Sequence, residues 1–490
     1  MLQNIKRFVK PQALVSIIYL TITLPAHGQC EVTQIASQGG FGSVSIDGDV
    51  AVVVDTDAFD SLGAVYVYQH GSAGPEDWKL DAVLMALEPD VEDNFGSSVA
   101  VSGNVIVVGA YNTNAPEFQS GAAHVFRYNP DTTEWEHEAT LTASDGDGSD
   151  RFGWSVAIDG DIVLIGALAD ENDGLNQSGS AYIFRYDTDT FRWIEETKLT
   201  DPNAEEDDGL GVSVSIRGDV ALIGAHGNDD AGGATGAAFI FRHDPNNPSK
   251  WVLEQQLQAF DAKWLAWFGW SVSLAEGVAL IGALQDDGQN GAAYVMRYDG
   301  ANWVHEAKLV ASNPVGPFPF LGRSVSLNHD GSTALVGAFH DDEAGNDAGA
   351  VHLFRTKGKT WQEIEKFTAS DPGAGDSFGS SVSLSDDTVV IKGGGKGYIF
   401  AGISGIDCND NSEPDACDIF DGQSKDQNSN GIPDECDADL DGNGTVGVGD
   451  LLILLVNWGL CDDCEICTAD LNGSCSVNTM DLLILFSNWG

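Results

Sequence analysis

Oxygen-bearing side chains recur at alternate positions in four short stretches near the C-terminus of this chain. Each stretch begins and ends on Asp and has the length of about twelve residues over which a calcium loop supplies its oxygen ligands. The sequence therefore predicts four Ca²⁺ sites. Their predicted ligands are Asp407, Asn409, Asn411, Asp415, Asp418, Asp426, Asn428, Asn430, Asp434, Asp437, Asp439, Asp441, Asn443, Thr445, Asp450, Asp470, Asn472, Ser474, Ser476 and Asp481.

The last two calcium loops belong to a duplicated unit. Each runs directly into an apolar segment, residues 451–455 in one copy and 482–486 in the other, and each copy then ends in Asn-Trp-Gly. Neither segment approaches the roughly 20 residues that a membrane helix needs. We therefore predict a small domain of paired calcium loops and helices. A disordered acidic linker is the alternative, and the regular spacing of the loops disfavours it.

Glycine marks a longer repeat that covers most of the chain. A Phe-Gly or Leu-Gly pair recurs every 53 to 58 residues, and a Gly-Ala pair follows the five middle copies. Residues 152–199 show the plan of one unit, with four strand-like runs separated by turns and loops. Four strands per unit are typical of a propeller blade. The seven pairs are Phe41-Gly42, Phe95-Gly96, Phe152-Gly153, Leu210-Gly211, Phe268-Gly269, Leu321-Gly322 and Phe378-Gly379.

The fourth run of each unit has a signature of its own, a tryptophan six residues before an apolar residue. There are six such runs for seven glycine pairs, so the last unit lacks its fourth strand. Residues 31–35 resemble the missing strand. We therefore predict an all-β, seven-bladed β-propeller of four-stranded blades, with an N-terminal strand closing the last blade. Such a closure removes open sheet edges.

These units resemble FG-GAP repeats, the family that forms the propellers of integrin α-subunits and of many secreted bacterial proteins. The resemblance covers about residues 30–402. The integrin-type calcium loop between the two halves of the motif is absent, and tight turns such as Arg217-Gly218-Asp219 replace it. We interpret that tripeptide as a turn, although it also spells an integrin-ligand motif. We therefore predict that calcium binds to the tail rather than to the propeller.

Two further resemblances cover the tail. The first two loops are similar to thrombospondin type 3 calcium repeats, and residues 438–490 resemble a type I dockerin, which attaches secreted enzymes to cohesin scaffolds. The resemblance implies a cohesin-like or surface partner. The sequence departs from the dockerin pattern at Cys475, which replaces a turn glycine, and at Val448-Gly449 and Thr479-Met480, which replace a Ser-Thr pair.

The long loops of the predicted blades are acidic. Up-and-down strands place the second-to-third and fourth-to-first loops on one face, where we expect a ring of carboxylates such as Asp170, Asp286 and Asp341. This face could bind a protein or glycan ligand, or loop calcium, or could simply be a solvated rim. His226 and His340 lie in the same loops and offer a metal role as a further alternative.

The N-terminus has the features of an export signal, with basic residues, a short apolar stretch and small residues before Gln29. Export permits disulfides, and seven of the eight cysteines lie in the tail. Closure of the propeller would bring Cys30 near Cys408, so we predict a bridge between them. Cys461, Cys464 and Cys467 could instead bind zinc. The predicted domains are a signal peptide (1–28), propeller (29–402), thrombospondin-type linker (403–437) and dockerin-like domain (438–490).

The formal net charge of −52 disfavours nucleic acid as a partner. No nucleophile elbow or other catalytic set stands out, so we expect no enzymatic activity. The leading prediction is a secreted, monomeric, calcium-binding recognition or adhesion protein without a membrane span, whose tail attaches it to a partner or to a cell surface. The alternatives are a carbohydrate-active enzyme that degrades polysaccharide and a structural matrix protein.

Overall fold

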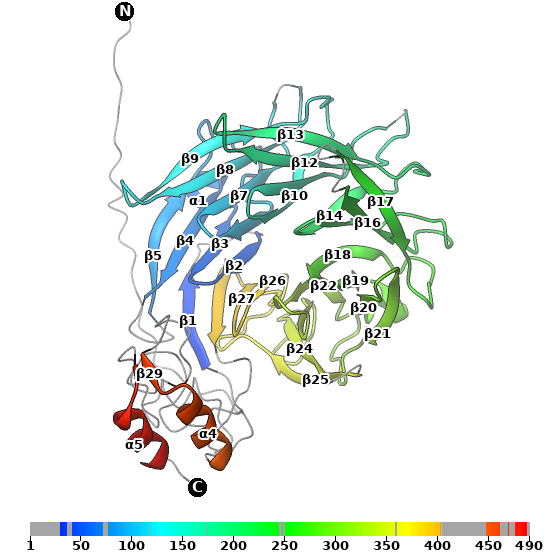
Figure 1. Ribbon diagram of the computed structural model, residues 1–490. Helices are drawn as coiled ribbons and strands as arrows, with labels where there is room; N and C mark the ends of the chain where they lie inside the picture. The colour runs from blue at the N-terminus through cyan, green and yellow to red at the C-terminus, as the bar shows by residue number, and fades with distance from the viewer. Residues whose placement is uncertain are drawn as a thin grey trace, which may run out of the picture.

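Seven four-stranded antiparallel sheets form a ring (Figure 1). This computed structural model describes residues 30–36, 42–71, 77–115, 117–172, 174–244, 247, 250–357, 360–401, 403, 447–460, 469 and 476–487. In the first six blades the strands follow chain order from the centre of the ring outward. The prediction of a seven-bladed β-propeller is confirmed.

The first three blades run from Val44 to Leu199. Blade 1 contains β2 (Val44–Asp47), β3 (Val50–Asp55), β4 (Ala64–His70) and β5 (Trp78–Leu84). Blade 2 contains β6 (Val99–Ser102), β7 (Val105–Ala110), β8 (Ala122–Asn129) and β9 (Glu134–Leu141). Blade 3 contains β10 (Phe152–Asp159), β11 (Ile162–Ala167), β12 (Ser180–Asp187) and β13 (Arg192–Leu199).

The other four blades complete the ring. Blade 4 contains β14 (Leu210–Arg217), β15 (Val220–Ala225), β16 (Ala237–His243) and β17 (Trp251–Leu257). Blade 5 contains β18 (Phe268–Ala275), β19 (Val278–Ala283), β20 (Ala292–Tyr298) and β21 (Trp303–Leu309). Blade 6 contains β22 (Leu321–Leu327), β23 (Thr333–Ala338), β24 (Ala350–Lys357) and β25 (Thr360–Phe367). Blade 7 contains β26 (Ser381–Ser385), β27 (Thr388–Gly393), β28 (Lys396–Ala401) and β1 (Cys30–Ala36).

The N-terminal strand closes the ring, as the strand count predicts. β1 pairs antiparallel with β28, with Cys30 opposite Ala401 and Ile35 opposite Gly397. Blade 1 also joins blade 7 on its inner side, because the Val44 amide donates to the Ser381 hydroxyl (3.1 Å). The same contact recurs along the seam between the Ile46 amide and Ser383 (3.1 Å) and between the Gly48 amide and Ser385 (3.0 Å). The first strand of blade 7 begins at Ser381.

Apolar side chains fill the spaces between neighbouring blades. The sheet of each blade packs between the sheets of its two neighbours. The residues of its second strand are therefore almost all buried, as in β11 and β19. One core cluster joins Phe268 and Tyr294 of blade 5 to Leu222 and Ile240 of blade 4. Another joins Val44 and Val53 of blade 1 to blade 7 across the closing seam. The hydrophobic effect therefore stabilises each blade against its neighbours.

The repeated glycines allow adjacent blades to approach. Gly211 follows Leu210 with φ of +90°, and a Cβ there would come well under 3.0 Å from the Ser180 carbonyl oxygen of blade 3. Gly166 of the Gly-Ala pair faces the Gly211 carbonyl oxygen equally closely. Ser155 donates a hydrogen bond to that same oxygen (2.8 Å). The two glycine pairs of the repeat are thus the two sides of one contact between blades.

The tryptophan signature also joins blades. In blades 2 to 6 the indole N–H donates to a carboxylate on the outer strand of the preceding blade. In blades 2 to 5 an arginine of the third strand pairs with the carboxylate of its own blade, as Arg127 does with Glu138 (2.8 Å). These charge-assisted bonds fasten the outer edge of the ring. The pairs are Trp135–Asp81 (3.0 Å), Trp193–Glu138 (2.8 Å), Trp251–Glu196 (2.9 Å), Trp303–Glu254 (3.2 Å) and Trp361–Glu306 (2.8 Å).

The described part of the tail contains two helices and a short ladder. The apolar segments form α4 (Val448–Val456) and α5 (Thr479–Ser487), and β29 (Gly459–Leu460) pairs antiparallel with β30 (Ser476–Val477). Among the described residues, none of the helices has the length and apolar character that crossing a membrane would require.

Candidate functional site

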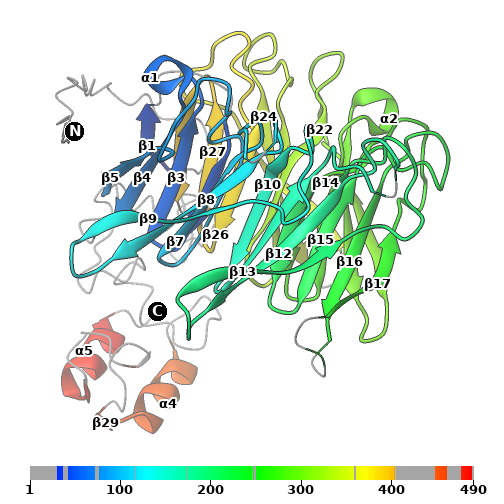
Figure 2. The same cartoon turned by 90° about the horizontal axis from the view of Figure 1, so that it is seen from above.

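The two faces of the propeller differ in their connections. On one face the strands are joined by tight turns such as the one at Gly160, whose φ is +57°. On the other face lie the second-to-third and fourth-to-first loops, which we call the long-loop face. Two of these loops contain short helices, α1 (Ala58–Ser61) and α2 (Asp286–Gln289). Figure 2 shows both helices on the same face of the ring.

Three of the predicted rim carboxylates point into the protein. Asp170, Asp286 and Asp341 are 4%, 1% and 0% exposed. Each pairs with a lysine from the fourth strand of its own blade, so the buried charge is compensated. The lysine partners are Lys198 (2.8 Å), Lys308 (2.5 Å) and Lys366 (2.9 Å), respectively.

Tyrosine hydroxyls complete two of these clusters. The Tyr182 hydroxyl donates to Asp170 (2.9 Å), and the Tyr294 hydroxyl donates to Asp286 (2.5 Å). Burial raises the pKa of Asp286, but hydrogen bonds from Lys308 and Tyr294 outweigh burial and hold that pKa below its ordinary value. The expectation of a rim of solvated carboxylates is therefore wrong for these residues, which hold the loops in place instead.

Other acids of the long-loop face remain exposed. Some of them are paired, as Asp287 is with Lys263 (3.2 Å) and Glu343 with Lys366 (2.5 Å), and together they give the face a negative potential. The exposed acids of these loops include Glu171, Glu205, Glu206, Asp207, Asp229, Asp230, Asp287 and Glu343.

Blade 4 lacks the lysine and tyrosine of its neighbours, since Gln256 and Phe239 take their places. Burial, together with the Asp201 carboxylate, raises the pKa of Asp208 to about 6. Asp201 Oδ2 and Asn228 Oδ1 are buried without a hydrogen-bond partner. Within the described part of the chain, however, no group of three or more His, Cys, Asp or Glu residues is arranged to hold a metal ion.

Only three of the predicted calcium ligands lie among the described residues. Asp450 is in the first turn of α4, fully buried, and its Oδ2 accepts a hydrogen bond from the Gly447 amide (2.6 Å). Ser476 belongs to β30 and Asp481 to α5. The other predicted ligands, and every cysteine except Cys30, lie outside the described residues, so the calcium sites and the Cys30–Cys408 bridge remain predictions.

Aromatic rings gather where strands of blades 5 and 6 reach the long-loop face. We call Trp267, Trp270, Phe320, Arg323 and Phe339 the mouth cluster. Trp267 and Trp270 are stacked, with centroids 5.4 Å apart and planes at 17°. The Arg323 guanidinium lies over Trp270 (5.3 Å) on one side and over Phe339 (5.5 Å) on the other. Phe320 packs on Phe339 with centroids 5.8 Å apart.

Two histidines border the mouth cluster. His226 lies edge-on to Trp267 and Trp270, at 5.6 and 5.2 Å. Burial lowers the pKa of His226 to about 4, so its imidazole is neutral at physiological pH. His340 packs against Phe339, with centroids 3.9 Å apart. Both histidines thus contact aromatic rings, and their predicted metal role is left without support in the described residues.

Sequence reasoning missed the mouth cluster because its members are variable positions of the repeat. The residue after each repeat glycine is Ser97, Trp154, Val212, Trp270, Arg323 or Ser380 in blades 2 to 7. This position lies at the equivalent place in every blade. A comparison of that single position across the repeats would have revealed the aromatic and basic residues.

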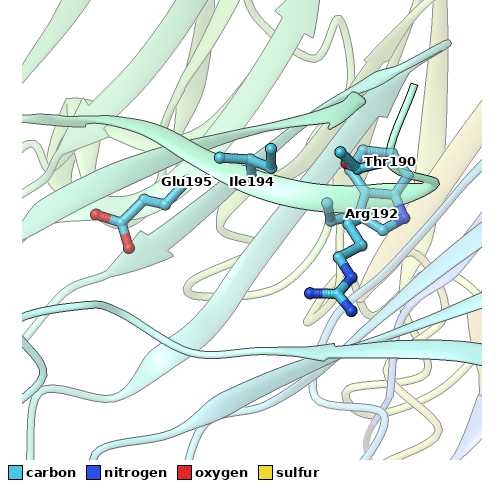
Figure 3. Close-up of a pocket in the computed structure, with 5 residues that line it drawn as sticks. Thr190, Arg192, Ile194 and Glu195 are labelled. Atoms are coloured by element: carbon cyan, nitrogen blue, oxygen red, sulfur yellow. The ribbon is translucent and has the colours of Figure 1, made fainter. Parts of the chain in front are cut away.

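A hollow of about 680 Å³ lies on the outer strand of blade 3 (Figure 3). Thr190, Arg192, Trp193, Ile194 and Glu195 line it. Glu195 is engaged by the Ser144 amide (2.8 Å) and hydroxyl (2.7 Å) of the preceding loop. Since Trp193 also bonds across to blade 2, the polar groups here join blades, and we do not assign a ligand site to this hollow.

Comparison with known proteins identifies the repeat. The family model for the FG-GAP repeat matches residues 78–126, 135–184, 193–241, 251–296, 303–354 and 361–394, which together make up more than half of the chain. Each match starts at an outer-strand tryptophan and continues into the next blade. No curated protein matches the chain. The chain belongs to the FG-GAP repeat family.

Proposed function

We propose that this protein is a secreted, calcium-binding recognition protein whose long-loop face binds a protein or glycan ligand. An FG-GAP propeller is a ligand-binding or recognition module, and such folds are typically non-catalytic. In this proposal the calcium loops stiffen a C-terminal attachment module, and the propeller carries the recognition surface.

The observation that carries the proposal is the uneven distribution of exposed aromatic side chains. Large exposed aromatic residues are typical of binding surfaces and are unnecessary on a rim that serves only solubility. Among the described propeller residues, one strongly exposed Phe, Phe191, lies on the opposite side, in the turn between β12 and β13. The exposed aromatic residues of the long loops, with their exposed fractions, are Phe59 (52%), Phe118 (64%), Phe260 (64%), Trp264 (74%) and Phe318 (47%).

The surrounding charge supports the same face. Exposed acids such as Asp229 and Asp287 lie in other loops of the same face. Aromatic groups supply contact area, and charged groups supply orientation and selectivity. Three of the long loops are held by the buried Lys–Asp pairs, so this part of the surface is preorganised and binding there loses little conformational entropy.

A binding panel with the full-length protein tests the proposal. Glycans and extracellular proteins are screened for binding in calcium-containing buffer, and glycans are checked in parallel for product release. We expect binding without turnover, and we expect Trp264→Ala to weaken it at least fivefold. Phe191→Ala is the matched control, because Phe191 is equally exposed (74%) on the other side. Loss of binding in the control alone, or turnover of a bound glycan, would contradict the proposal.

A further inference from the structure

We propose that the mouth cluster is a subsite for an acidic sugar, that is, for a residue bearing one carboxylate on an otherwise neutral glycan. The inference rests on the proposed function and deepens it by naming the ligand class. It assigns the carboxylate to Arg323 and the sugar ring to the neighbouring aromatic faces.

Arg323 is a cation without an anionic partner. Its guanidinium lies over the rings of Trp270 and Phe339, and no hydrogen bond or ion pair links it to another described residue. Its side chain is half-buried, and burial lowers the pKa of the guanidinium. The protein carries 75 acids, yet none of the described ones contacts Arg323. A desolvated, unpaired guanidinium favours an incoming carboxylate, which it can bind through two parallel hydrogen bonds.

The aromatic residues beside Arg323 occupy costly backbone positions. The residue before the repeat pair has a positive φ in blades 2 to 7, and blade 4 has Gly209 there (+63°). Blades 5 and 6 place Trp267 and Phe320 there instead, both at +56°. A bulky side chain in the left-handed region is unfavourable, and such strain is characteristic of functional positions. These rings are half-buried and therefore still accessible.

The equivalent positions of blades 1, 2 and 7 are small and hydroxylated. Ser43, Ser97 and Ser380 of blades 1, 2 and 7 follow their repeat glycines at the position that Trp270 and Arg323 occupy in blades 5 and 6. The Ser43 hydroxyl is buried and has no hydrogen-bond partner. A pyranose ring presents C–H groups on its faces and hydroxyls at its edge. It therefore matches an aromatic wall on one side and serine hydroxyls on the other.

The charge around the mouth restricts the ligand further. Arg323 attracts one carboxylate, whereas exposed acids of the surrounding loops, such as Asp229 and Glu343, repel additional ones. A glycan with isolated carboxylates fits this pattern better than a polyanion. Peptide carboxylates have the same anionic group, so a peptide bearing one carboxylate is tested alongside the glycan probes.

Binding of three glycan probes to the full-length protein tests the proposal by calorimetry. The probes are a xylo-oligosaccharide carrying one glucuronate, the same oligosaccharide without it, and an oligogalacturonate of equal length. We expect the single glucuronate to strengthen binding about tenfold over the neutral probe, as a charge-assisted pair should. The oligogalacturonate should bind more weakly than the single-glucuronate probe and improve as salt screens the rim.

Variants assign the effect to Arg323. Arg323→Gln should bring the two xylo-oligosaccharide probes within about twofold of each other, while binding of the neutral probe persists. Arg192→Gln is the control, an exposed arginine on the outer strand β13 (Figure 3). The comparison of probes on the unaltered protein needs no variant, so it stands even if Arg323→Gln folds poorly.

Three results would overturn the inference. They are equal affinity for the charged and neutral probes, no binding of the glucuronate probe, and binding of a carboxylate-bearing peptide but of no glycan. In the last case, sensitivity to Trp264→Ala would leave the proposed function standing while this inference fails. Binding that depends on neither the mouth cluster nor the loop aromatics would reject both.

Discussion

Replacement of a repeat glycine by alanine tests how the blades are joined. Gly211 has a φ of +90°, and a Cβ there would collide with the Ser180 carbonyl oxygen of the preceding blade. Gly160 in the turn of blade 3 also has a positive φ (+57°), but nothing lies within 4 Å of its hypothetical Cβ. The two glycines therefore share the backbone strain and differ in the steric contact.

This difference sets the expected magnitudes. Gly160→Ala should cost about 1–2 kcal/mol of unfolding free energy, the cost of placing an alanine in the left-handed region. Gly211→Ala should add roughly 1–3 kcal/mol for forcing a methyl group into a packed contact, giving a loss of about 2–5 kcal/mol. Such a loss is a large fraction of the roughly 5–15 kcal/mol that stabilises a typical domain.

Urea unfolding followed by tryptophan fluorescence measures both variants, with circular dichroism as a second probe. The midpoint for Gly211→Ala should fall well below that for Gly160→Ala, at similar slopes. Equal losses in the two variants would refute the reasoning, because they would mean that the glycine is needed for its φ alone. A neutral Gly211→Ala would refute the interblade contact altogether.

Three other predictions follow from the same structure. Asp208→Asn keeps the acceptor for the Glu205 amide (2.8 Å) but removes a carboxyl whose folded pKa, about 6, exceeds its unfolded value near 3.8, so the charged form destabilises the fold above pH 6. In urea unfolding at pH 7.5, the free energy of unfolding of the variant should therefore be higher by up to about 2 kcal/mol. This gain should vanish below pH 4. Trp251→Phe, which leaves Glu196 without the indole donor (2.9 Å), should cost about 1–3 kcal/mol in the same assay, whereas an unchanged midpoint would remove the outer-edge bond from the account. Chelation of calcium should lower the thermal midpoint of the full-length protein, because a bound ion stabilises the folded state by mass action; identical scanning calorimetry traces with and without chelator would contradict the predicted tail sites.

The repeat made most of the propeller predictable. The four strands expected within residues 152–199 appear as β10 to β13. The missing seventh tryptophan led to the closing strand β1, because β28 would otherwise lack the outer partner that the third strand has in every other blade. Periodic glycine and aromatic positions made this prediction possible, because the same contacts between blades recur in every copy.

The candidate site was less predictable, because it depends on contacts between residues far apart in the chain. The long loops were expected to be acidic, but the burial of Asp170 could not be read from its loop, since Lys198 reaches it from another strand. The mouth cluster combines Trp270 with Arg323 across a blade boundary. The calcium ligands follow a regular pattern in the sequence, yet most lie outside the described residues.

Amide hydrogen exchange of the full-length protein, measured with and without the ligand that the panel identifies, tests the central claim most directly. The account predicts new protection in the loops joining β3 to β4, β7 to β8, β17 to β18 and β21 to β22, which carry Phe59, Phe118, Trp264 and Phe318. The turns of the opposite face, such as the one at Gly160, should exchange as before. Protection confined to those turns or to the outer strands would contradict the assignment of recognition to the long-loop face.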